Sequence, residues 1–137
     1  MVHVLKNIHR LLQPGDYLLD IRPYQKHSIA EVHDGDTIHV AGEVSRRDNW
    51  EKQGWADDAL SEVVGEGLFV EEASEVYGCR LYAPSYTELE AYIAEEWQRS
   101  RLDDEVVERI KELMAAGSES ATIAIQYFTV IKRLRRI

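Results

Sequence analysis

The chain has 137 residues, which is the size of one ordinary domain. Apolar residues make up 45% of it and charged residues 30%, a composition typical of globular rather than disordered proteins. Its 25 acidic and 16 basic residues give a net charge of −9, which disfavours binding to nucleic acid or to an anionic membrane surface. The single cysteine, Cys79, cannot form an internal disulfide, and no apolar run reaches membrane-spanning length. We therefore expect a single domain, residues 1–137, of a soluble cytoplasmic protein.

The N-terminal part of the sequence predicts a helix, a strand and a hairpin. Apolar residues at helical spacing predict a helix over residues 4–12. Residues 17–21 form an almost continuous apolar run, which indicates a strand that is buried on both faces. Residues 29–41 alternate in polarity on both sides of Asp34-Gly35-Asp36, and this pattern predicts a β-hairpin.

The rest of the sequence predicts three helices and two long strands. The first of these helices spans residues 48–64, unless Gly54 divides it, and a long strand over residues 68–83 follows. Ser85-Tyr86-Thr87-Glu88 has the form of a capping box and begins the second helix. The third helix lies between Asp103 and Gly117. Residues 121–134 are apolar on both sides of an alternating pattern, which indicates a central strand.

Sequence patterns for a metal site, a nucleophile or a nucleotide loop are weak. His27, His33 and His39 are spaced six residues apart, without the tight spacing of zinc ligands, so we expect no structural metal. Cys79 lies within a strand pattern, where cysteine is usually a small buried apolar residue. No glycine-rich phosphate loop joins a predicted strand to a predicted helix.

Three residues after the first predicted strand are candidates for contact with a substrate. Arg22, Tyr24 and His27 follow its carboxyl end, and ligands of open α/β sheets gather at that end. The alternative is that these residues form an ordinary loop.

Charge is distributed unevenly along the chain. Residues 43–75 contain ten acidic and three basic side chains, whereas residues 132–136 are strongly basic. The simpler interpretation is a solvated acidic surface beside a strand end that binds carboxylates. The alternative is that segments of opposite charge attract one another between two copies of the chain.

The order of these elements resembles the C-terminal half of class I S-adenosylmethionine-dependent methyltransferases. The segment at residues 8–21, IHRLLQPGDYLLDI, is similar to the family passage that leads from a helix through Pro-Gly into the fifth strand, with Asp16 in place of a second glycine. The other similar segments are residues 67–69, 86–93, 97–102 and 121–134. The resemblance implies an α+β fold, a truncated Rossmann-like domain whose mixed sheet contains strands five to seven and a β-hairpin.

The resemblance also implies how the chain functions. The family binds S-adenosylmethionine through motifs in its N-terminal half, and these motifs map onto no position here. We therefore expect a non-catalytic, dimerising or accessory protein that binds no cofactor alone. In one alternative, the chain is the substrate-side portion of a methyltransferase that a second polypeptide completes, with Arg22, Tyr24 and His27 as substrate contacts. In another, it is a small-ligand binding protein.

The family's strand four, which pairs with strand five, has no counterpart in this sequence. The strand at residues 17–21 would then have an unpaired apolar edge, which proteins usually cover. A homodimer, a complementary polypeptide or the hairpin at residues 29–41 would each cover it. We favour association, because the hairpin is short and polar at its tip.

Overall fold

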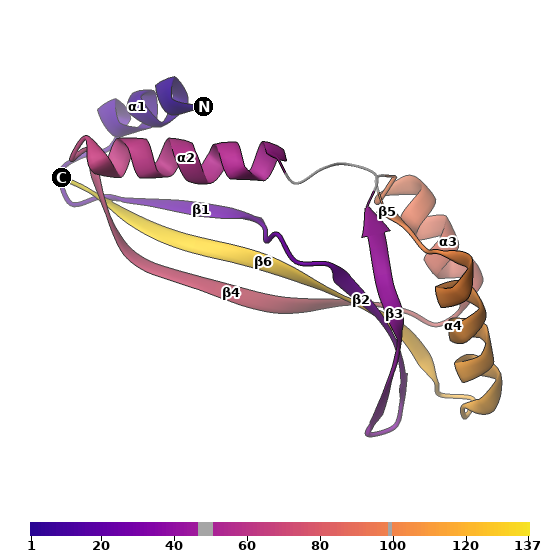
Figure 1. The fold of residues 1–137 in the computed structure, drawn as a ribbon. Coiled ribbons are helices and arrows are strands. Elements are labelled where there is room, and N and C mark those ends of the chain that lie inside the picture. Colours follow the sequence, from indigo (N-terminus) through magenta and orange to yellow (C-terminus); the bar gives the residue numbers. More distant parts are fainter. Residues whose placement is uncertain (47–50, 99) are drawn as a thin grey trace. The chain divides into compact units, whose positions relative to one another are not determined.

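The structure, a computed structural model, describes residues 1–46, 51–98 and 100–137. In these residues four helices pack with an open, mostly antiparallel mixed sheet, so the α+β class is confirmed. None of the helices described is long and apolar enough to cross a bilayer. The elements in chain order are α1 (Val2–Leu11), β1 (Tyr17–Pro23), β2 (Ser28–Asp34), β3 (Thr37–Arg46), α2 (Glu51–Gly65), β4 (Phe69–Ala83), α3 (Tyr86–Glu95), β5 (Ser100–Arg101), α4 (Asp104–Ala116) and β6 (Thr122–Arg136) (Figure 1).

Strand β6 takes part in both of the compact units into which the chain divides. The first unit contains β1, β6 from Thr129 onward, the first part of β4, and helices α1 and α2. The second contains β2, β3, β5, α3, α4 and the remaining parts of β4 and β6. Strands β1, β2 and β4 all pair with β6, which confirms the prediction that the last strand is central.

In the first unit, helices α1 and α2 cover one face of the sheet. The buried residues between these helices and the sheet form one core, which consists of Leu5, Ala59, Leu60, Val63, Phe69 and Leu134. Leu18 of β1 packs against this core. Helix α2 is continuous through Gly54, while residues 48–50 of the predicted helix lie outside the described residues.

In the second unit, helices α3 and α4 pack against the β2–β3 hairpin and β6. The hairpin is as predicted, with Gly35 of its turn at a φ of 59°. The Ser85 side chain accepts a hydrogen bond from the Glu88 N–H at 3.3 Å, which confirms the predicted start of α3. The buried core consists of Ala30, Val32, Val44, Ala83, Leu89, Ile110, Ala121, Ile123 and Ile125.

The prediction that residues 17–21 are buried on both faces is wrong. Exposed and half-buried residues alternate along β1, because α1 and α2 cover only one of its faces. Leu18 lies on the covered face, and Leu19 lies on the face that no helix of this unit covers.

A β-bulge in β3 brings this strand close to α4. The pairing register between β2 and β3 shifts between Ala30 and Glu31, so that Ala41 is the extra residue. At Gly42, which follows it with a φ of 156°, a Cβ atom would lie only 2.7 Å from Cγ2 of Val106. Glycine is therefore required here by the close approach of the helix.

We predict that Gly42→Ala lowers the free energy of unfolding by about 1–3 kcal/mol, because the added methyl group overpacks the contact with α4. Denaturant unfolding of the purified variant measures this change. Gly54→Ala is the matched control: apart from its chain neighbours and its own helix backbone, no atom of the described residues lies within 4 Å of the added methyl group, and we expect it to stabilise α2 by about 0.5–1 kcal/mol. Equal stability of the Gly42→Ala variant and the unmodified chain would contradict the close contact.

Candidate functional site

Arg22, the first of the predicted substrate contacts, is bound within the chain. Its side chain is 13% exposed, and its Nε donates to Oδ2 of Asp20 at 2.8 Å. Its Nη1 and Nη2 atoms donate to the two carboxylate oxygens of Asp57 at 3.2 and 2.5 Å. This bidentate pair fastens β1 to α2. Arg22 therefore has a structural role in the first unit.

The Asp57 carboxylate joins Arg22 to a second cation. Nζ of Lys132 lies 3.3 Å from Oδ1 of Asp57 and 3.4 Å from Oε2 of Glu71. The hydrogen bonds from Arg22 hold the pKa of Asp57 below its usual range against the effect of partial burial, and Lys132 contributes to the same lowering. The ion pairs thus connect α2 with β1, β6 and β4.

The other two predicted contacts, Tyr24 and His27, are both exposed. Tyr24 belongs to the first unit and His27 to the second, so the three candidates do not form a cluster within one unit. Their role as substrate contacts stays a prediction.

The outer edge of β1 is the feature of the first unit that most clearly suggests a function. Tyr17, Leu19 and Ile21 are 52%, 57% and 62% exposed, although all three are large and apolar. In the part of the chain that the structure describes, β1 pairs with β6 alone. Its register with β6 is regular over all seven residues. A flat strand edge beside an apolar row is a surface on which another strand can pair.

The direction of the β1 backbone groups follows from a hydrogen bond at its beginning. The carbonyl oxygen of Asp16 accepts the N–H of Arg136 at 2.8 Å and so faces β6. Alternate residues of an antiparallel strand face the same neighbour, which places the backbone groups of the odd-numbered residues 17–23 on the outer edge. Pro23, which has no N–H, is odd-numbered and therefore removes no hydrogen bond to β6.

The sheet's other open edges carry features that oppose pairing. In the described residues β4 also pairs with β6 alone, but three of the first seven residues of β4 are glutamates. Strand β3 has a bulge, which twists its edge away from a regular partner. The charged residues of β1, by contrast, are Asp20 and Arg22, which pair with each other. Between Tyr17 and Arg22, strand β1 has no bulge and a regular register with β6, and Pro23 limits its outer edge at the end of the strand.

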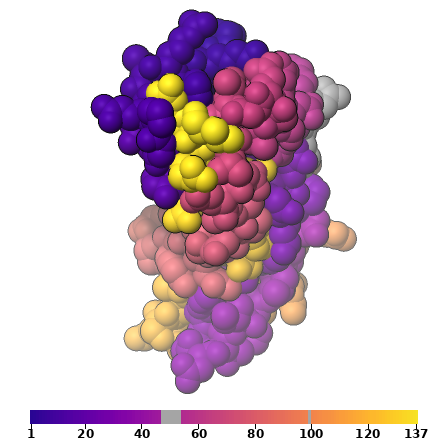
Figure 2. All heavy atoms as spheres, turned by 90° about the vertical axis from the view of Figure 1, so that its left-hand side faces the viewer, coloured from indigo at the N-terminus to yellow at the C-terminus, as the bar shows by residue number. Residues whose placement is uncertain are grey.

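The basic C-terminal residues form ion pairs within the first unit. Nε of Arg135 lies 2.6 Å and Nη2 of Arg133 3.4 Å from carboxylate oxygens of Glu72. Arg133 also lies over the ring of Tyr17, 5.3 Å from its centre. Figure 2 shows the yellow C-terminal atoms between the indigo N-terminal segment and the pink atoms of α2 and β4. These contacts support the simpler of the two interpretations of charge.

A buried carboxylate, Glu31, binds the side chains of Arg80 and His33 in the second unit. Its side chain is 5% exposed, and its Oε2 atom lies 3.0 Å from Nε of Arg80 and 2.7 Å from Nε2 of His33. Glu31 lies on β2 opposite Ala124 of β6, and Arg80 lies on β4, so this contact joins two strands that both pair with β6. Burial raises the pKa of Glu31, but the hydrogen bonds with Arg80 and His33 outweigh this effect and the pKa is lowered.

The histidines singled out in the sequence do not gather into a metal site. Throughout residues 1–46, 51–98 and 100–137, no group of three His, Cys, Asp or Glu side chains is arranged to hold a metal ion. His33 pairs with Glu31, and the Asp34 carboxylate accepts hydrogen bonds from the backbone N–H and the hydroxyl of Ser118. The hydrogen bonds from Ser118 join the end of β2 to the segment after α4, whereas the His33–Glu31 pair lies within β2.

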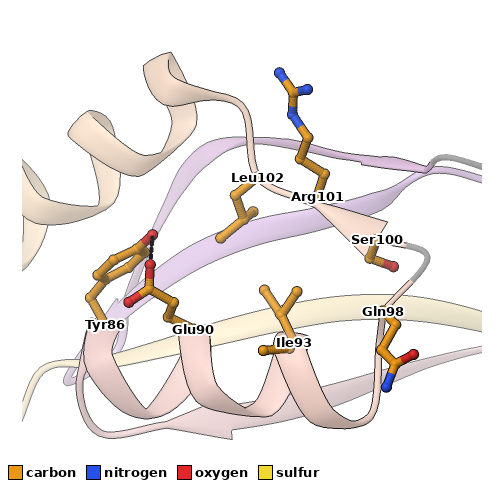
Figure 3. Close-up of a pocket in the computed structure, with 8 residues that line it drawn as sticks. Tyr86, Glu90, Ile93, Gln98, Ser100, Arg101 and Leu102 are labelled. Carbon is orange, nitrogen blue, oxygen red and sulfur yellow. Dashed lines mark hydrogen bonds between the residues drawn. The ribbon is translucent and has the colours of Figure 1, made fainter.

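A shallow pocket of about 400 Å³ lies beside α3 in the second unit (Figure 3). Its residues are Tyr86, Glu90, Ile93, Ala94, Gln98, Ser100, Arg101 and Leu102. Burial and the nearby Glu90 carboxylate both raise the pKa of Tyr86, whose hydroxyl donates to Glu90 at 3.5 Å. Arg101 pairs with Asp103 and points away from Tyr86 and Glu90. The polar groups therefore do not converge on one point of the pocket.

Comparison with known proteins gave no match to a family model, to a curated protein or to a solved structure. The resemblance to methyltransferases stays a prediction from the sequence.

We predict that Arg80→Met lowers the free energy of unfolding at pH 7 by about 1–3 kcal/mol, because the buried Glu31 loses a charged hydrogen-bond donor. The pKa of Glu31 is lowered in the folded chain, so the ion pair with Arg80 stabilises the fold at pH values above 4.5, the ordinary pKa of a glutamate. This stabilisation disappears as the pH falls through the lower, folded-state pKa. The difference in the free energy of unfolding between the Arg80→Met variant and the unmodified chain should therefore become smaller below pH 4.5.

Urea unfolding between pH 3 and pH 7 measures this difference. Arg101→Met is the matched control, since Arg101 and Asp103 are both exposed and their atoms are 3.4 Å apart. The control should change stability little at any pH. An Arg80→Met penalty that is independent of pH would show that the lost interaction is not with an ionised Glu31.

Proposed function

We propose that this chain is a protein-association domain, an accessory domain that acts by binding another polypeptide and does not bind S-adenosylmethionine alone. The observation that carries the proposal is the outer edge of β1, where unpaired backbone groups lie beside exposed Tyr17, Leu19 and Ile21. Addition of a strand to such an edge supplies main-chain hydrogen bonds and covers apolar side chains. The net charge of −9 favours a protein partner over a nucleic acid.

The finer structural part of the proposal is that the fold is a truncated Rossmann-like one. In its support, β1 and β4 both pair with β6. The methyltransferase resemblance implies an antiparallel last strand at residues 121–134, and β6 runs antiparallel to β1. The partner of β1 would then replace the strand that the family places there.

We predict that Leu19→Lys raises the dissociation constant of the assembly by at least about tenfold, because a charged ammonium group replaces a side chain that the partner covers. Sedimentation velocity of the purified chain measures the assembly. Ile38→Lys is the matched control, because Ile38 is a comparably exposed apolar residue of β3. The control should assemble as the unmodified chain does.

Affinity purification of the tagged chain from cells extends this test to other partners. A chain that is monomeric and retains no protein in a Leu19-dependent way contradicts the association proposal. Leu19-dependent retention of a different protein would support association and favour the alternative in which a second polypeptide completes the domain.

Calorimetry tests the cofactor part of the proposal. We expect no heat of binding when S-adenosylmethionine is titrated into the purified chain, since none of the family's cofactor motifs maps onto this sequence. Micromolar affinity would contradict the accessory role and indicate a cofactor site within the chain itself.

A further inference from the structure

We propose that the partner of β1 is a second copy of this chain, and that the two β1 strands pair antiparallel about a two-fold axis at Leu19. This inference rests on the proposed function, because it names the occupant of the same strand edge. It is argued from the direction of the backbone groups, from the order of side chains along β1 and from the position of its charges.

The backbone of β1 permits this pairing without rearrangement. Its odd-numbered residues direct their N–H and carbonyl groups outward, as the hydrogen bond between Arg136 and Asp16 establishes. With the axis at Leu19, the hydrogen-bonded pairs are Leu19 with Leu19 and Tyr17 with Ile21 of the other copy. Within residues 1–46, 51–98 and 100–137, no second strand pairs with β1, so the outward N–H and carbonyl groups of these residues are not used in strand pairing.

The same register brings complementary side chains together. Tyr17, Leu19 and Ile21 of the two copies form one continuous apolar row across the new strand pair, because cross-strand partners lie on the same face. In this register Asp16 is opposite Arg22 and Asp20 is opposite Leu18 of the other copy, so no carboxylate of β1 or its preceding residue lies opposite another carboxylate. The sequence of the edge is thus complementary to itself.

Neighbouring registers are less favourable for identifiable reasons. An axis at Leu18 places Asp16 opposite Asp20 of the other copy, and does so twice. An axis at Asp20 places this carboxylate directly opposite its own equivalent, where like charges repel. Both the Asp20 and the Ile21 registers also place Pro23 in a hydrogen-bonded pair, although it has no N–H to donate. The proposed register avoids all of these conflicts.

Disulfide cross-linking tests the partner and the register together. Single cysteines are introduced at residues 17, 19 or 21 of the full chain in a Cys79→Ser background, which removes its one native cysteine. In the proposed dimer the two Cα atoms at position 19 are about 5.5 Å apart, within the range that a disulfide requires. The two Cα atoms at position 21 are separated by about four residues of strand, roughly 13 Å, which is too far.

We expect Leu19→Cys to form a covalent dimer on mild oxidation at least about tenfold faster than Ile21→Cys, since only the former has its cysteines within reach. An equimolar mixture of Tyr17→Cys and Ile21→Cys should form the covalent heterodimer, whereas neither variant should cross-link well alone. Thermal melting of each reduced variant verifies that it is folded.

The outcomes separate the inference from the proposed function. Equal cross-linking of Leu19→Cys and Ile21→Cys, or an assembly larger than a dimer, overturns the inference while Leu19-dependent association stands. A monomeric chain that retains a different protein through Leu19 overturns the inference in the same way. A monomer without any Leu19-dependent partner overturns both.

Discussion

The backbone pairing of β6 is the interaction on which both compact units depend. Strands β1, β2 and β4 all take β6 as a hydrogen-bonding neighbour, and β3 reaches it only through β2. The apolar side chains of β6 complete a separate helix-covered core in each unit, through Leu134 in the first and through Ile123 and Ile125 in the second. Because β6 has strand neighbours and apolar residues on both of its sides, it is an inner strand of the sheet and not an edge on which a partner could pair.

In each unit a charged cluster joins elements that are distant in the sequence. Arg22 joins β1 to α2 through Asp57, and Arg80 joins β4 to β2 through the buried Glu31. In both clusters the carboxylate pKa is lowered because a guanidinium donates hydrogen bonds to it. Such a partly buried pair fixes the position of a strand more firmly than an exposed pair, since removal of one partner leaves the other charge desolvated.

These internal contacts determine which surface is left for a partner. Arg22 donates hydrogen bonds to Asp57 of α2 and so joins β1 to this helix. The apolar row of Tyr17, Leu19 and Ile21 is left exposed by the same arrangement. The edges of β3 and β4 carry a bulge and glutamates, and β1 has neither. Features that oppose strand pairing at the edges of β3 and β4 are thus consistent with the proposal that the chain associates through β1.

The sequence by itself determined the features that depend on neighbouring residues: the hairpin turn at Gly35, the start of α3 at Ser85 and the apolar pattern of β6. It did not determine which face of β1 is covered, because an apolar run looks the same whether helices cover one face or both. The tertiary structure decided this point by placing α1 and α2 on the Leu18 side alone. Asp57 lies 35 residues from Arg22 and Arg80 lies 49 residues from Glu31, and only packing in three dimensions brings such charges together.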